Sequence, residues 1–146
     1  MKPPLYSDLA RHRYEKAVQT LKEGRDAFAL GNFGNTVSRC YYAMFSAMRA
    51  LLAMKKLDAK THAGVLSLFN QHFVNEKLLP KGFGKLAKDA KNIRERADYG
   101  DFEITTKEVA AEYLEKADVF LKRVEILLRQ MLLAANGNGK NGKHER

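Results

Sequence analysis

The stretch TVSRCYYAMFSAMRALLAMKK, residues 36–56, decides the fold of this chain. Apolar side chains occur nearly all round the helix that this stretch predicts, so it should be the buried centre of a helical bundle. Its longest apolar run without a charge is CYYAMFSAM, nine residues between Arg39 and Arg49. A membrane-spanning helix needs about 20 such residues, so we expect no membrane segment here.

Apolar residues recur at helical spacing on both sides of this stretch and predict four further helices. The five expected helices cover residues 7–30, 36–56, 61–77, 83–97 and 105–134. Their expected N-terminal caps are Asn35 or Thr36, then Thr61, and a capping box of Thr105 and Glu108. No alternating strand pattern and no internal repeat occur, and there are only three prolines. Long helices with short connections predict an all-α fold, an antiparallel up-and-down bundle of four or five helices.

The length of 146 residues predicts one domain, which we place at residues 1–134. Residues 135–146 are rich in Gly, Asn and Lys and are expected to form a disordered tail. The only cysteine is Cys40, and the N-terminal residues contain no apolar leader, so the cytoplasm is the expected location. The histidines lack paired spacing, so neither a metal nor a cofactor is predicted.

The formal net charge is +9, which attracts polyanions such as RNA, DNA or nucleotides, although it also serves solubility. Between residues 77 and 96, seven Lys or Arg residues accompany only Asp89 and Glu95. At 100° per residue, some of these cations form a stripe away from the apolar face of the expected helix. The stripe contains Lys81, Lys85, Lys88 and Arg96. It is either a footprint for a nucleic-acid backbone or a solvated face.

The segment NIRERADYG, residues 92–100, places four chemically distinctive side chains at a helix end. Arg94 falls at the edge of the apolar face, so its guanidinium should be partly buried and needs a partner. One interpretation is a structural Arg94–Asp98 pair that closes the helix, which physical arguments alone favour. The other is a guanidinium held for phosphate recognition or for charge that develops during phosphoryl transfer. Tyr99 lies beside both groups in the sequence.

The few polar side chains of residues 36–56 share one narrow stripe of the expected helix. They are Arg39, Tyr42, Ser46 and Arg49, at spacings of three, four and three residues. Either the helix meets water along this stripe, which the spacing alone favours, or the stripe lines a groove or an interface.

Four segments in order resemble the HEPN domain (higher eukaryotes and prokaryotes nucleotide-binding). These segments are SRCYYAMFSAMRALL, KTHAGVLSLF, RERADYG and TTKEVAAEYLEKADVFLKRV. The resemblance covers about residues 7–133 and is greatest to small stand-alone prokaryotic members with an Arg-x-x-Ala-Asp-Tyr motif. It implies a helical bundle that dimerises, a connection to RNA or nucleotides, and a minimal nucleotidyltransferase partner in a toxin–antitoxin pair.

In ribonuclease members of the family, the site is an arginine followed after four to six residues by a histidine. This chain departs from that pattern, because the corresponding positions after Arg94 hold Tyr99 and Asp101. The pKa of a free tyrosine is about 10, against about 6.5 for histidine, so tyrosine is a poor base at neutral pH.

Three functional hypotheses follow. The first is a binding module for RNA or nucleotide phosphate. The second is a metal-independent ribonuclease that uses Arg94 with Tyr99, Asp98 or the distant His62. The third is a non-catalytic subunit whose basic face docks an acidic partner. The candidate phosphate-binding residues are Arg96, Lys81, Lys85, Lys88, Arg39 and Arg49.

Overall fold

The computed structural model describes residues 5–100 and 104–144, with side chains in the second range up to residue 136. Its elements are α1 (Tyr6–Ala29), α2 (Phe33–Met54), α3 (His62–Phe69), a π-helical turn η1 (Asn70–Val74), α4 (Phe83–Tyr99) and α5 (Lys107–His144). No strand occurs within the described ranges. The all-α prediction is therefore confirmed.

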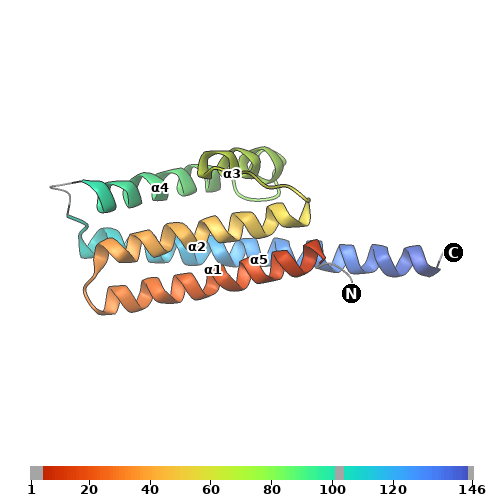
Figure 1. The fold of residues 1–146 in the computed structure, drawn as a ribbon, viewed down its shortest axis with the longest axis horizontal. Coiled ribbons are helices and arrows are strands. Elements are labelled where there is room, and N and C mark those ends of the chain that lie inside the picture. The colour runs from red at the N-terminus through yellow and green to blue at the C-terminus, as the bar shows by residue number, and fades with distance from the viewer. Residues whose placement is uncertain (1–4, 101–103, 145–146) are drawn as a thin grey trace.

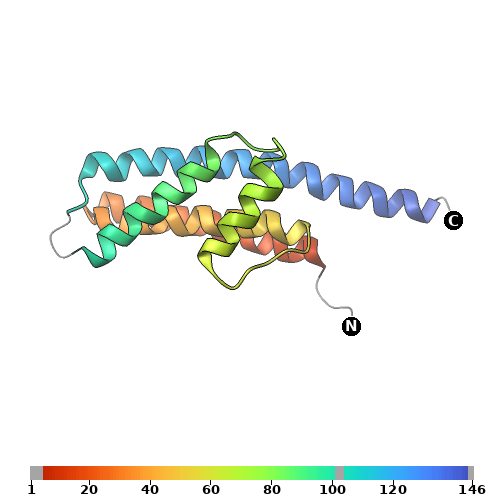
Figure 2. The same ribbon diagram turned by 90° about the horizontal axis from the view of Figure 1, so that it is seen from above.

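Helix α2 is the centre of the bundle. The long helices α1, α2, α4 and α5 alternate in direction along the chain (Figure 1). Helix α2 packs against α1, α3, α4 and α5, and 13 of its 22 residues are buried. Seen from above, α3 and α4 lie over α2, and α4 crosses the α2–α5 layer at an angle (Figure 2). The prediction that residues 36–56 form the central helix is confirmed. A helix that is apolar nearly all round can bury every face only when other helices surround it.

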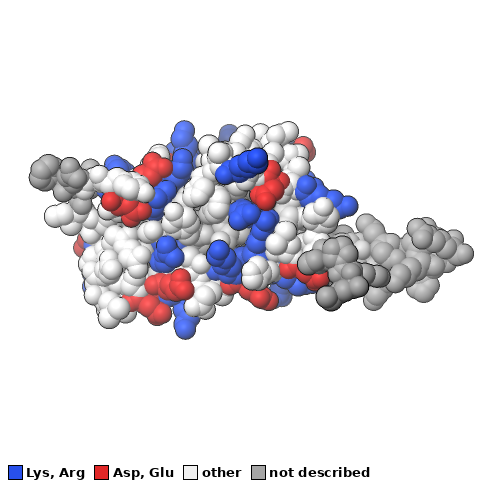
Figure 3. All heavy atoms as spheres, in the orientation of Figure 1, with Lys and Arg blue, Asp and Glu red and all other residues white. Residues whose placement is uncertain are grey.

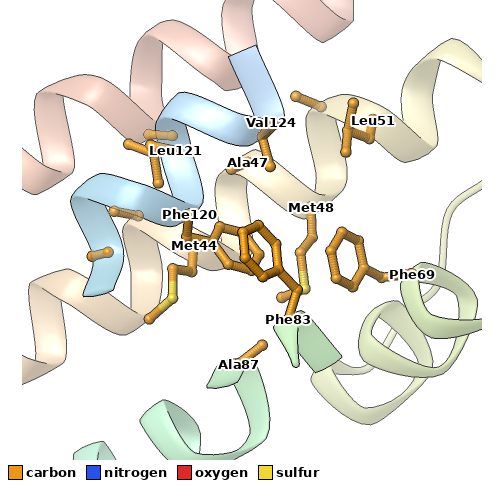
Figure 4. Close-up of a cluster of buried hydrophobic side chains, with 14 of the residues drawn as sticks. Met44, Ala47, Met48, Leu51, Phe69, Phe83, Ala87, Phe120, Leu121 and Val124 are labelled. Atoms are coloured by element: carbon orange, nitrogen blue, oxygen red, sulfur yellow. The ribbon is translucent and has the colours of Figure 1, made fainter. Parts of the chain in front are cut away.

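Aromatic rings from α3, α4 and α5 pack together where α3 and α4 lie over the α2–α5 layer (Figure 4). The ring of Phe120 in α5 stacks on Phe83 of α4 at 4.8 Å and lies 5.7 Å from Phe69 of α3. Met44 and Met48 of α2 are fully buried in the same cluster. Flexible thioether side chains fill the irregular gaps that flat rings leave between crossing helices.

Two predicted helix starts were wrong by a few residues. Helix α2 begins at Phe33, and its cap is Asn32, whose side-chain oxygen accepts a hydrogen bond from the N–H of Asn35 at 3.3 Å. The cap of α5 is Thr106, whose hydroxyl accepts from the N–H of Val109 at 3.2 Å, rather than the predicted pair of Thr105 and Glu108. Adjacent Asn and Thr residues offer equivalent caps in the sequence, and the tertiary position of the chain selects between them. The predicted cap at Thr61 is confirmed by its contact with the N–H of Gly64 at 2.9 Å.

The third predicted helix, 61–77, is shorter in the structure. Helix α3 ends at Phe69, and η1 follows with an N–H of Asn75 donating to the carbonyl of Asn70 at 2.8 Å. Beyond it, the carbonyl of Phe73 accepts from the N–H groups of both Leu78 and Leu79. These bonds close a turn that buries Leu79, which is 4% exposed. Burial of an apolar side chain thus ends a helix that local propensity would continue.

Helix α5 runs to His144 and extends beyond the ends of the other helices (Figure 1). It therefore includes residues 135–144, where the sequence predicts a disordered tail. The division of the chain into a domain that ends at residue 134 and a tail stays a prediction. Within the described ranges, no helix has an apolar stretch long and uncharged enough to cross a membrane.

Two glycines lie close together here, Gly31 in the turn between α1 and α2 and Gly34 in the first turn of α2. An added Cβ would meet no atom within 4 Å at either Gly31 or Gly34, but only Gly31 has a positive φ, +77°. We expect Gly31→Ala to lower the free energy of unfolding by about 1 kcal/mol, because an L side chain is strained there. Gly34→Ala should raise it by about 0.5 kcal/mol, because Gly34 is helical. Urea unfolding of both variants measures the difference, and equal effects would contradict the expectation.

Candidate functional site

Arg94 is buried between two helices. Its side chain leaves α4 and lies against α2, with the guanidinium carbon 5.3 Å from the ring centre of Tyr41 and 5.4 Å from that of Tyr42. The residue is 8% exposed, the only charged residue in the buried set of the described chain. The predicted partial burial of Arg94 is therefore observed. The faces of the two aromatic rings attract the guanidinium and so replace part of the favourable interaction with water that burial removes.

The polar partners of Arg94 are few. One guanidinium nitrogen, Nη1, donates to Asp98 at 3.3 Å, and Nη2 lies 4.0 Å from Glu95. The Nε–H group is buried and has no acceptor within the described residues. Burial disfavours the positive charge, yet the neighbouring tyrosines and Asp98 together raise the pKa of Arg94 above its ordinary value. The site thus holds a permanently charged guanidinium whose hydrogen-bonding capacity the described residues do not fill.

The structure brings His62 to the same place. The hydroxyl of Tyr41 and Nδ1 of His62 are 2.7 Å apart, and the imidazole stacks on Phe45 at 4.3 Å. Burial, followed by the charge of Arg94, lowers the pKa of His62 below its ordinary value. Burial also raises the pKa of Tyr41 to about 12, so that its hydroxyl stays protonated at neutral pH.

The sequence offers His62 only as a distant candidate and does not single out Tyr41. The spacing of Tyr41 and Phe45, four residues apart on one helix, was the available signal for a shared aromatic face. The contact with His62 spans 21 residues of the chain, so only the packing of α3 on α2 creates it.

Tyr99 and Arg96 lie at the outer edge of the site. Tyr99 is 75% exposed. Both line an open depression of about 690 Å³, together with Arg94, Asn92, Glu95 and Gly100. Asp98 is also exposed and pairs with Arg94, as the structural interpretation predicts. Asp101, the other motif position, lies outside the described residues.

The predicted lysine stripe does not join Arg94. Lys81, Lys85 and Lys88 are all exposed, and Lys85 pairs with Asp89 at 2.7 Å. At 100° per residue, Lys85 lies about 180° round α4 from Arg94. The stripe therefore faces solvent while Arg94 faces α2. Whether these lysines bind phosphate stays a prediction.

The polar stripe of α2 lines a groove. Arg39, Tyr42, Ser46 and Arg49 form one wall of a groove of about 280 Å³ with Phe45, and Lys16 and Thr20 of α1 form the other. The four side chains are partly exposed, so the helix meets water along this stripe, and the same stripe lines a groove. Lys and Arg side chains are spread over the middle of the face on which α1 and α2 lie in front (Figure 3).

The described residues contain no cluster of three His, Cys, Asp or Glu side chains that could hold a metal ion. The candidate site consists of a buried guanidinium, a tyrosine–histidine contact and an open basic rim. Together they provide fixed positive charge beside an imidazole, which can exchange a proton and whose pKa lies below its ordinary value.

Fold and site define an all-helical bundle domain with an arginine-centred candidate site. The sequence matches the HEPN domain family over residues 10–127. It is 33% identical to two proteins of Methanocaldococcus jannaschii, each named "Putative toxin". The match to MJ0605 covers 81% of this chain and 87% of that protein, and the match to MJ0142 covers 87% and 88%. It is also 30% identical to a UPF0332 protein of Archaeoglobus fulgidus, over 77% of this chain and 90% of that one. This chain belongs to the HEPN family, as the four quoted segments predicted.

Proposed function

We propose that this chain is a toxin-like HEPN protein that binds the phosphate backbone of RNA at Arg94. The observation that carries the proposal is the guanidinium of Arg94, held against Tyr41 and Tyr42 at the inner wall of an open depression. Among the described residues, its one close hydrogen-bond acceptor is Asp98 at 3.3 Å. The names of the two archaeal relatives support the toxin-like part of the proposal.

A guanidinium suits this role because its fork of N–H donors matches two oxygens of one phosphate. The packing of Arg94 on α2 fixes its direction before a ligand arrives, so little side-chain entropy is lost on binding. The exposed ring of Tyr99 on the rim offers a face on which a base can stack, and Arg96 adds a second charge beside it.

Fluorescence anisotropy with a labelled single-stranded oligouridine tests the proposal. We expect Arg94→Ala to weaken binding by about tenfold or more, because a phosphate contact and its charge are lost together. Arg94→Lys keeps the positive charge but lacks the paired N–H donors of a guanidinium. Its affinity for the oligouridine should therefore lie between those of Arg94→Ala and the wild type.

Arg129→Ala is the matched control for the binding measurement. Arg129 is exposed on α5, where it pairs with Glu125 at 3.6 Å, so its removal changes the net charge equally. Circular dichroism checks that each variant is folded. The binding proposal is wrong if wild-type protein fails to bind at low salt, or if Arg94→Ala and Arg129→Ala bind equally well.

The contact between His62 and Tyr41 favours a second candidate function, metal-independent cleavage of RNA. In such a step, Nε2 of His62 accepts the proton of a ribose 2′-hydroxyl, and the 2′-oxygen attacks phosphorus. The bond to the 5′-oxygen breaks, that oxygen takes a proton from solvent, and a 2′,3′-cyclic phosphate remains. Arg94 would stabilise the charge on the phosphoryl oxygens. Cleavage that persists in EDTA and is lost in His62→Ala is the expected result.

We also propose that the protein forms a homodimer and has a minimal nucleotidyltransferase partner, as the family resemblance implies. Exposed apolar side chains support a protein contact, because Val119, Ile126 and Leu133 of α5 lie seven residues apart on one face. Light scattering after size exclusion measures the dimer, and co-purification from the native host measures the partner. A monomer that purifies alone would contradict both, whereas an acidic partner without any RNA binding would favour the docking-subunit hypothesis.

A further inference from the structure

The groove between α1 and α2 carries positive charge that the protein itself only partly neutralises. Among the described residues, Lys16 has no carboxylate within 4.0 Å. Arg39 reaches only Glu23, at 3.8 Å, and its Nε–H is buried without an acceptor. Arg49 has Asp58 at 3.4 Å, but that carboxylate also pairs with Arg13 at 3.5 Å.

The neighbouring grooves differ from this one in charge. The two depressions between α1 and α5 contain carboxylates in their walls, among them Glu15, Glu125 and Asp118. Among the described residues, the walls of the α1–α2 groove contain Lys16, Arg39 and Arg49 and no acidic residue. An anionic ligand is therefore attracted to the α1–α2 groove in preference to the others.

Two aromatic rings lie in the same groove. Tyr42 and Phe45 are partly exposed there, with Arg39 5.3 Å from the ring centre of Tyr42 and Arg49 6.0 Å from that of Phe45. Cations that alternate with partly exposed rings are typical of surfaces that bind single-stranded nucleic acid, because phosphates meet the charges while bases stack on the rings.

Tyr42 connects this groove to the site of Arg94. Its ring centre is 5.3 Å from the guanidinium carbon of Arg39 and 5.4 Å from that of Arg94, so the two carbons are at most 10.7 Å apart. A short oligonucleotide can bridge such a separation. The ring of Tyr42 thus lies close to one cation of the groove and to the cation of the candidate site.

From these observations we infer that the α1–α2 groove binds further phosphates of the same single-stranded RNA whose first phosphate meets Arg94. The inference rests on the proposed function and adds the path of the strand: from Arg94, past Tyr42, into the groove at Arg39, Arg49 and Lys16. Recognition there is by backbone charge and stacking, so it is independent of base sequence.

The test uses the full chain and a labelled oligouridine of about eight nucleotides, a length within the sites of about 4–16 nucleotides common for such surfaces. The variant is Arg39→Gln with Arg49→Gln, and the charge-matched control is Lys122→Gln with Arg129→Gln. The control residues are each 73% exposed on α5, outside the groove. We expect the groove variant to bind about tenfold more weakly and its salt slope to fall by about 1.4, because each lost single-strand phosphate contact lowers the slope by about 0.7. The control should change little in either measurement.

A second variant, Lys16→Glu, removes no ion pair and lies on an exposed position of α1, so it tests the groove if the double variant folds poorly. It should also weaken binding. If Arg94→Ala weakens binding but neither groove variant does, the inference is wrong while the proposed function stands. If the wild type does not bind the oligouridine, the proposed function and the inference about the groove are both wrong. If the groove variants change only the oligomeric state, the groove joins copies of this chain and the inference is overturned.

Discussion

Replacing Phe120 by alanine should lower the free energy of unfolding by about 3–5 kcal/mol, the usual range for removing a large buried ring. Phe120 is 0% exposed and touches rings from two other elements, Phe83 at 4.8 Å and Phe69 at 5.7 Å (Figure 4). The ring joins α5 to α3 and α4, which pack on the other side of the core. Since neither neighbouring ring can collapse into the space without moving its own helix, we expect the cavity to persist.

Urea unfolding followed by circular dichroism measures this loss. Val18→Ala is the control, because Val18 lies on α1, outside this cluster and outside the proposed dimer face of α5, and is 48% exposed. Its substitution should change stability by no more than about 0.5 kcal/mol. A loss below about 1 kcal/mol in Phe120→Ala would mean that the layer of α3 and α4 is not held by this cluster.

The second large effect concerns His62. If the protein cleaves RNA, His62→Gln should reduce the cleavage rate constant by about 10²–10⁴-fold, the contribution usual for a positioned general base. For Nε2 to act as a base, Nδ1 must carry the ring proton and donate it to the hydroxyl oxygen of Tyr41, 2.7 Å away. Tyr41→Phe removes that acceptor and should cause a smaller loss.

The pH profile separates a base from a structural role. Burial and the charge of Arg94 lower the pKa of His62 below 6.5. Only the neutral imidazole accepts a proton, so the rate should rise with pH through this lowered pKa and level off above it. Lys91 also lowers the pKa of His62, so Lys91→Gln should move the midpoint of the rise to higher pH.

His12→Gln is the control, because His12 is an exposed histidine on α1 and its replacement should leave the cleavage rate unchanged. All cleavage is measured in EDTA to exclude contaminating metal-dependent nucleases. Equal rates in His62→Gln and wild type would show that another group is the base. Absence of cleavage by the wild type would leave RNA binding as the remaining proposal.

Much of the fold could be predicted from the sequence because hydrophobic periodicity is a local property. Residues 36–56 are apolar nearly all round, and this fixed α2 as the surrounded helix before any contact was known. Ala117, Phe120 and Val124 recur at helical spacing in the sequence, and the face of α5 that carries them is buried. The errors lie at helix ends, at Asn32 and Thr106, where neighbouring residues offer caps of equal local energy.

The candidate site was only half predictable. The edge position of Arg94 on an amphipathic helix indicated a partly buried guanidinium, and its pair with Asp98, four residues on, is local enough to be anticipated. Tyr41 and His62 are distant in sequence from Arg94, and no local pattern relates them.

The sequence by itself therefore determined the helical class, the central helix, and the family to which the chain belongs. These follow from the order and spacing of apolar residues and from short motifs, which need no knowledge of contacts. Only the tertiary structure decided that His62 meets Tyr41 beside Arg94, and that Tyr42 links Arg94 to the groove of Arg39. The reason is physical: these contacts depend on the angle at which α3 and α4 pack on α2, and side chains of the whole core set that angle together.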